Sequence, residues 1–132
     1  MSFDVVKTEL NLMYANDPAE GTPRVRLNDE ELERWARLTD TTKELLCDRI
    51  GIYLAHGFHN SRLSFYFCDG IVNDLFGLIT SCQVGWPDIF WRVYLTFDEG
   101  EYHHRNDGEQ DPVELYTKPR IAEIGAAYPH VV

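Results

Sequence analysis

The chain is poor in basic residues, and it lacks a long uninterrupted apolar run. Its 132 residues contain 12 Lys and Arg against 22 Asp and Glu, so the formal net charge is −10 at pH 7. Nonspecific nucleic-acid binding needs a basic surface that releases counterions from phosphates, so this charge balance argues against a nucleic-acid partner. It also disfavours adsorption to anionic membranes, and no apolar stretch is long enough to span a bilayer.

Cysteine is also scarce, and its arrangement does not suggest a disulfide framework. Cys47, Cys68 and Cys82 form an odd set with wide spacing, and no Cys-x-x-Cys is present. Disulfide frameworks usually use an even number of cysteines. Residues 1–8 contain Asp4 and a single lysine with no apolar run behind them, which does not resemble a signal peptide. We therefore expect reduced, passive thiols in a cytoplasmic protein.

Motifs for common enzyme chemistry are missing. The sequence has no Gly-x-Ser-x-Gly elbow, no phosphate-binding loop and no dinucleotide-binding glycine pattern. Cys68 lies among aromatic residues, where burial raises the pKa of a thiol and makes it inert. The sequence thus predicts no catalytic residue and no cofactor, and a non-enzymatic role is favoured over an enzyme.

The sequence is rich in large apolar and aromatic side chains between residues 45 and 97. Hydrophobic residues make up 44% of the whole chain, which is ample for a globular core. A chain of this length usually forms one domain. We predict a single globular helical domain over residues 1–132.

Apolar spacing and capping residues predict mostly α structure. Helical spacing occurs in residues 3–14, and Asn28 with Glu31 resembles a capping box at a helix start. A surface loop is expected over 16–23, where two prolines and a glycine occur. Thr41 with Glu44 suggests the start of the next helix, and Gly57 suggests its end.

The longest helical pattern covers residues 62–80, where Leu63, Phe67, Ile71 and Leu75 recur at steps of four. It is apolar on most sides, so we expect it to be the central and most buried helix. Residues 89–97 also have helical spacing, but they are rich in strand formers, and a strand is the alternative there. The predicted fold is a compact irregular bundle of five or six helices around the central apolar helix 62–80.

Two groups of polar residues could carry chemistry. His56 and His59 are three residues apart and could share a metal ion with Asp69 as a further ligand, although Gly57 between them is expected to separate them. A small metal-dependent enzyme or ligand-binding domain using His56, His59 and Asp69 is therefore the alternative function. Asp69 and Asn73 share a helix face, which is interpreted as an exposed stripe unless Asp69 is buried beside a partner.

The acidic segment 98–114 is the predicted partner-binding region. Its carboxylates could steer a basic protein, and Tyr102 and Tyr116 are expected to be exposed anchors. The leading hypothesis is a small acidic non-enzymatic protein-binding domain that neutralises or positions a basic partner. Immunity proteins, antitoxins and adaptors share this general composition, which is an analogy only. A homo-oligomer is a further alternative. The candidate binding residues are Asp98, Glu99, Glu101, Tyr102, Asp107, Glu109 and Tyr116.

Overall fold

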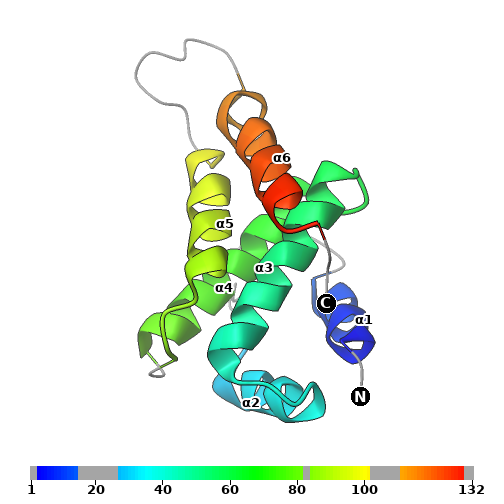
Figure 1. Cartoon of the computed structure of the whole chain (residues 1–132), viewed down its shortest axis with the longest axis vertical. Helices are drawn as coiled ribbons and strands as arrows, with labels where there is room; N and C mark the ends of the chain where they lie inside the picture. The colour runs from blue at the N-terminus through cyan, green and yellow to red at the C-terminus, as the bar shows by residue number, and fades with distance from the viewer. Residues whose placement is uncertain (1–2, 15–26, 82–83, 102–110, 130–132) are drawn as a thin grey trace, which may run out of the picture.

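The chain folds into a bundle of helices. The computed structural model describes residues 3–14, 27–81, 84–101 and 111–129, and within these ranges there is no strand. The mostly α bundle predicted from the sequence is confirmed, and residues 89–97 are helical. The elements, in order, are α1 (Asp4–Met13), α2 (Asp29–Leu38), α3 (Lys43–His59), α4 (Phe65–Ser81), α5 (Asp88–Glu99), the π-helix η1 (Val113–Thr117) and α6 (Lys118–Ala127) (Figure 1).

Local side-chain caps fix where three helices begin. Asn28 Oδ1 accepts a hydrogen bond from the Glu31 amide at 2.9 Å, as the sequence predicts for the start of α2. The cap of α3 is Thr42, whose hydroxyl accepts from the Leu45 amide at 3.1 Å, so the prediction of Thr41 is wrong by one residue. Ser64 accepts from the Phe67 amide at 3.1 Å. The helix predicted over 62–80 therefore begins at Phe65 and ends at Ser81.

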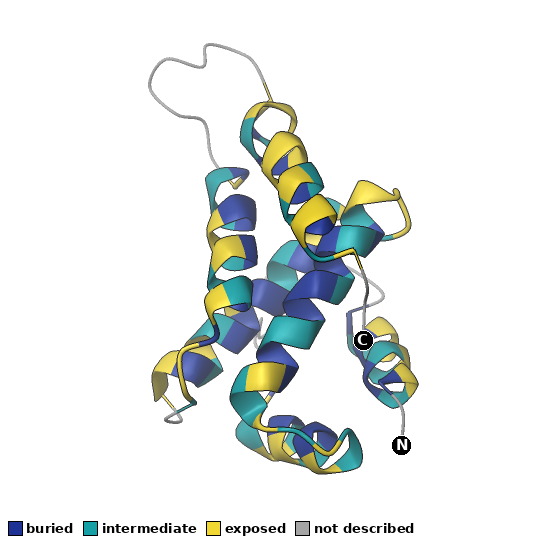
Figure 2. Cartoon of the chain, viewed as in Figure 1, coloured by how far each residue is buried: buried dark blue, intermediate teal, exposed yellow. Residues whose placement is uncertain are grey.

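The central position belongs to α3 rather than to α4. Helix α3 packs against α2, α4, α5 and α6, and its contacts with α5 and α6 are the most extensive in the bundle. Figure 2 shows that α3 is buried or half-buried along most of its length. Helix α4 is also strongly buried on one side, but it leaves an exposed stripe. The expectation of a central helix over 62–80 is wrong because it counted apolar residues along one segment and could not see how many elements surround α3.

Two glycines in α3 mark places where other parts of the chain come close. A Cβ at Gly51 would lie 3.2 Å from Phe90 Cα, so the glycine lets α3 and α5 approach closely. A Cβ at Gly57 would overlap the side chain of Leu63, which folds back onto the helix. Helix α3 continues past Gly57 to His59, so the predicted stop at this glycine is wrong.

Contacts between residues far apart in sequence hold α1 and α5 in place. Helix α5 has no side-chain cap of its own, and Asp48 from α3 accepts a hydrogen bond from the Phe90 amide at 2.9 Å. The Tyr14 hydroxyl at the end of α1 donates to Asp74 Oδ2 of α4 at 2.5 Å, inside the core. These contacts connect the first helix to the fourth and the third to the fifth.

Helix α1 is also linked to α2. The carboxylate of Glu9 pairs with Arg34 and accepts a hydrogen bond from Trp35 Nε1 at 2.9 Å. Hydrogen bonding to Arg34 and Trp35 lowers the pKa of Glu9.

None of the helices in the described part of the chain has the length and apolar character that a membrane crossing requires. The loop predicted over 16–23 lies outside the described residues.

Candidate partner-binding surface

A row of aromatic rings lies where α4 meets α5. Phe76 of α4 stacks on Tyr94 of α5 with ring centroids 4.4 Å apart, and Trp91 stacks on Tyr94 at 5.4 Å. Trp86, in the connection before α5, packs on Trp91 at 4.9 Å and is 49% exposed. Trp91 and Tyr94 face the same way because they are three residues apart on α5. We call Phe76, Trp86, Trp91 and Tyr94 the aromatic row.

Carboxyl groups continue the same face at one end of the aromatic row. Asp69 and Asn73 precede Phe76 on α4 at helical spacing, while Asp98 follows Tyr94 by four residues on α5. Asn73 Nδ2 donates to Glu101 Oε2 at 2.9 Å, which ties the residues after α5 to α4. We call Asp69, Asp98 and Glu101 the carboxyl cluster.

The carboxyl cluster perturbs the ionisation of its members. Burial raises the pKa of Asp69 to about 9, and the side-chain hydrogen bond with Glu101 and the charges of Glu101 and Asp98 act in the same direction. Burial also raises the pKa of Asp98, again with a contribution from Glu101. The pKa of Tyr94 is raised by burial and then by the charges of Asp98, Glu101 and Asp69, and Asp98 lies one helical turn after this ring on α5.

The carboxyl cluster has no basic counterpart among the described residues. No lysine or arginine in those ranges forms an ion pair with Asp69, Asp98 or Glu101, whereas the neighbouring Glu99 lies 3.9 Å from Arg120 Nη1. Asp69 Oδ1 is buried and accepts no hydrogen bond from the described chain. The α4–α5 face therefore combines exposed aromatic surface with the carboxylates of Asp98 and Glu101, which no described basic side chain neutralises.

The structure brings together some of the predicted binding residues. Asp98 and Glu99 lie half-buried in the last turn of α5, and Glu101 is exposed two residues later. Tyr116 lies in η1 and is half-buried rather than exposed, and its role as an anchor stays a prediction. The other three candidates, Tyr102, Asp107 and Glu109, lie outside the described residues.

The sequence did not reveal two parts of this surface. Asp69 was interpreted as part of an exposed stripe, yet it is half-buried against residues that follow it by about thirty positions. The sequence also gives no location for the rings of Trp86 and Trp91, which the structure places side by side on this face. The helical spacing of Trp91, Tyr94 and Asp98 is the signal that could have joined rings and carboxylates on one face.

The metal-binding alternative finds no assembled site in the described ranges. His56 Nε2 donates to the carbonyl oxygen of Tyr128 at 2.6 Å, while His59 is exposed at the end of α3. Asp69 belongs to the carboxyl cluster instead. Within residues 3–14, 27–81, 84–101 and 111–129, no three His, Cys, Asp or Glu side chains are grouped so that they could hold a metal ion.

The two described cysteines are free thiols inside the core. Cys47 lies in α3 and Cys68 in α4, and both are fully buried. Burial raises the pKa of the Cys47 thiol to about 12 and also raises that of Cys68. Both groups are therefore protonated and poorly nucleophilic at neutral pH, as the sequence predicts for Cys68. Cys82 lies outside the described residues.

No protein-family model, curated protein or solved structure matches this chain. The interpretation of the α4–α5 face therefore depends on its own geometry and charge.

Proposed function

We propose that this protein is a small acidic, non-enzymatic binding domain that neutralises or positions a basic protein partner through its α4–α5 face. The observation that carries the proposal is the continuity of the aromatic row with the carboxyl cluster. Tyr94 stacks on Phe76 and Trp91 and lies in the field of Asp69, Asp98 and Glu101.

The aromatic row suits the centre of a protein interface. Tryptophan and tyrosine are enriched among the residues that dominate binding energy, because they bury a large area at low conformational cost. Trp86 is half exposed, so a partner could bury much of its remaining surface. Exposed aromatic faces also attract guanidinium groups through cation–π interactions.

The carboxyl cluster favours a basic partner over an acidic or neutral one. Asp98 and Glu101 form no ion pair with the described residues. An incoming lysine or arginine would therefore not need to displace an existing basic partner. Complementary charges mainly raise the association rate and select the partner, and salt screens this effect. The overall charge of −10 would add long-range attraction.

The test begins with affinity capture from native cells, followed by kinetics with the purified partner. We expect Trp86→Ala to weaken binding by about tenfold or more, as is typical for an interface tryptophan. Glu101→Gln should slow association, and added salt should slow the wild type more than this variant.

Matched controls separate the α4–α5 face from general surface effects. Leu12→Ala removes an exposed apolar side chain from α1, and Glu30→Gln removes an exposed charge from α2. Both controls should bind like the wild type. If Trp86→Ala and Glu101→Gln also bind like the wild type, the α4–α5 face is not the binding surface. If light scattering shows that the wild type is a dimer and that Trp86→Ala is a monomer, the face instead binds a second copy of the chain.

A further inference from the structure

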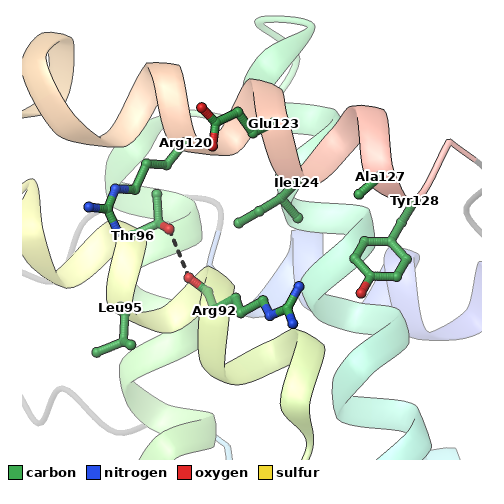
Figure 3. Close-up of a pocket in the computed structure, with 8 residues that line it drawn as sticks. All are labelled: Arg92, Leu95, Thr96, Arg120, Glu123, Ile124, Ala127 and Tyr128. Carbon is green, nitrogen blue, oxygen red and sulfur yellow. Dashed lines mark hydrogen bonds between the residues drawn. The ribbon is translucent and has the colours of Figure 1, made fainter.

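A cleft of about 270 Å³ opens between α5 and α6, separate from the α4–α5 face. Arg92, Leu95 and Thr96 contribute to it from α5, and Arg120 and Ile124 from α6 (Figure 3). Two of the twelve basic side chains of this acidic protein therefore line one cleft. Two of the charged side chains that line the cleft are basic and one, Glu123, is acidic, which reverses the balance of charges in the whole chain.

Arg92 is the group that points to a ligand. Its guanidinium has no hydrogen bond or ion pair with any residue in the described ranges, and only its backbone carbonyl is engaged, by the Thr96 hydroxyl at 2.8 Å. Figure 3 shows the side chain extending from α5 towards Tyr128. Arg120 extends from α6 back over α5, and its nearest carboxylate, Glu99, is 3.9 Å away, beyond hydrogen-bond distance.

The rest of the lining suits a small apolar body. Ile124 and Ala127 from α6 and Leu95 from α5 supply aliphatic surface beside the guanidinium groups. Ligand pockets for drug-sized molecules are about 300–1,000 Å³, so this cleft fits a smaller molecule. Glu123 also lines the cleft, and its carboxylate would repel a ligand with several negative charges.

We propose that the α5–α6 cleft binds a small organic monocarboxylate. The carboxylate is held by the Arg92 guanidinium beside the Tyr128 hydroxyl, and Arg120 adds positive charge at the other end of the cleft. The short aliphatic body of the ligand lies on Leu95 and Ile124. Arginine suits this role because its planar fork matches the two oxygens of a carboxylate.

Titration of the isotope-labelled protein with 4-methylpentanoate, followed by amide NMR shifts, tests the proposal. We expect saturable shifts of the amides around Arg92, Ile124 and Tyr128. The neutral analogue 4-methylpentanamide has the same shape without the charge, and it should give no saturable shifts over the same concentrations. Arg92→Gln should weaken carboxylate binding by about tenfold, because it removes a charge-assisted hydrogen bond.

Arg62→Gln is the matched control, since Arg62 is another exposed arginine that forms no ion pair with the described residues and does not line the cleft. It should bind 4-methylpentanoate like the wild type. The proposal is wrong if the carboxylate and the amide bind equally, or if Arg92→Gln, with its amide spectrum otherwise intact, binds as well as the wild type. Stronger binding of a pentapeptide that ends in leucine than of 4-methylpentanoate would overturn it in favour of a peptide C-terminus.

Discussion

Asp69 should make the stability of the protein depend on pH in a direction opposite to that of an ordinary surface carboxylate. Its pKa is about 9 in the folded chain against an ordinary value of 3.8. Between these two pH values the folded state therefore holds a proton that the unfolded state has released. The contribution of Asp69 to stability is fully present below the unfolded value and is lost as the pH rises towards 9. Asp69→Asn removes this titration while keeping the shape of the side chain.

The size of the effect follows from the linkage of one proton. Full linkage changes the free energy of unfolding by about 1.4 kcal/mol per pH unit. The Asp69 side chain is half-buried and shares its hydrogen bond with Glu101, so solvent screening reduces the effect. We expect about 0.5 kcal/mol per pH unit, so Asp69→Asn should gain about 1 kcal/mol over the wild type between pH 6 and pH 8.

Urea unfolding followed by far-ultraviolet circular dichroism would measure this difference at several pH values. Asp40→Asn is the matched control, because Asp40 is exposed and its backbone, at φ 53°, is one that asparagine also adopts. Other titrating groups are common to all variants and largely cancel in the comparison. If the gap between Asp69→Asn and the wild type is the same at pH 6 and pH 8, Asp69 titrates normally and the carboxyl cluster is wrongly described.

Three further substitutions test the packing of the bundle by equilibrium unfolding. Tyr14→Phe should cost about 2 kcal/mol, because it removes a buried hydrogen bond to the Asp74 carboxylate; an unchanged midpoint would show that α1 is not tied to α4. Leu75→Ala should cost about 2–5 kcal/mol, because the side chain is fully buried and leaves a cavity; a cost well below this range would place it outside the core. Gly57→Ala should lose about 1 kcal/mol, since the clash with Leu63 outweighs the gain in helix propensity; a stabilised variant would show that Leu63 moves freely.

Features set by neighbouring residues could be predicted from the sequence. The predicted N-cap at Asn28 is confirmed, because an N-cap depends only on the capping residue and the next three residues. The helical spacing of residues 89–97 outweighs their strand propensity, because α5 buries one face on α3 and α4. Of the predicted binding residues, Asp98 and Glu101 lie in the carboxyl cluster, because a dense run of carboxylates is visible without a structure; their part in binding stays a prediction.

Features set by distant residues could not be predicted. The cap of α5 comes from Asp48, which is 42 positions away from the amide it binds. Gly57 resembles a helix end, but its small size instead accommodates Leu63. Asp69 joins the carboxyl cluster only because α4 and α5 pack together, and no local pattern reports that pairing.

The hydrogen bond from Trp35 to Glu9 gives the protein an internal optical reporter. The Trp35 indole is fully buried and lies where α1 meets α2, whereas Trp86 is half exposed on the α4–α5 face. Release of α1 would expose the Trp35 indole to water and shift its fluorescence to longer wavelength, while the environment of Trp86 would stay the same. A soluble quencher would quench the exposed Trp86 before the buried Trp35. A partner bound over Trp86 would protect this ring from the quencher. Detachment of the first helix and occupation of the binding face can thus be read as two separate signals from one unlabelled chain.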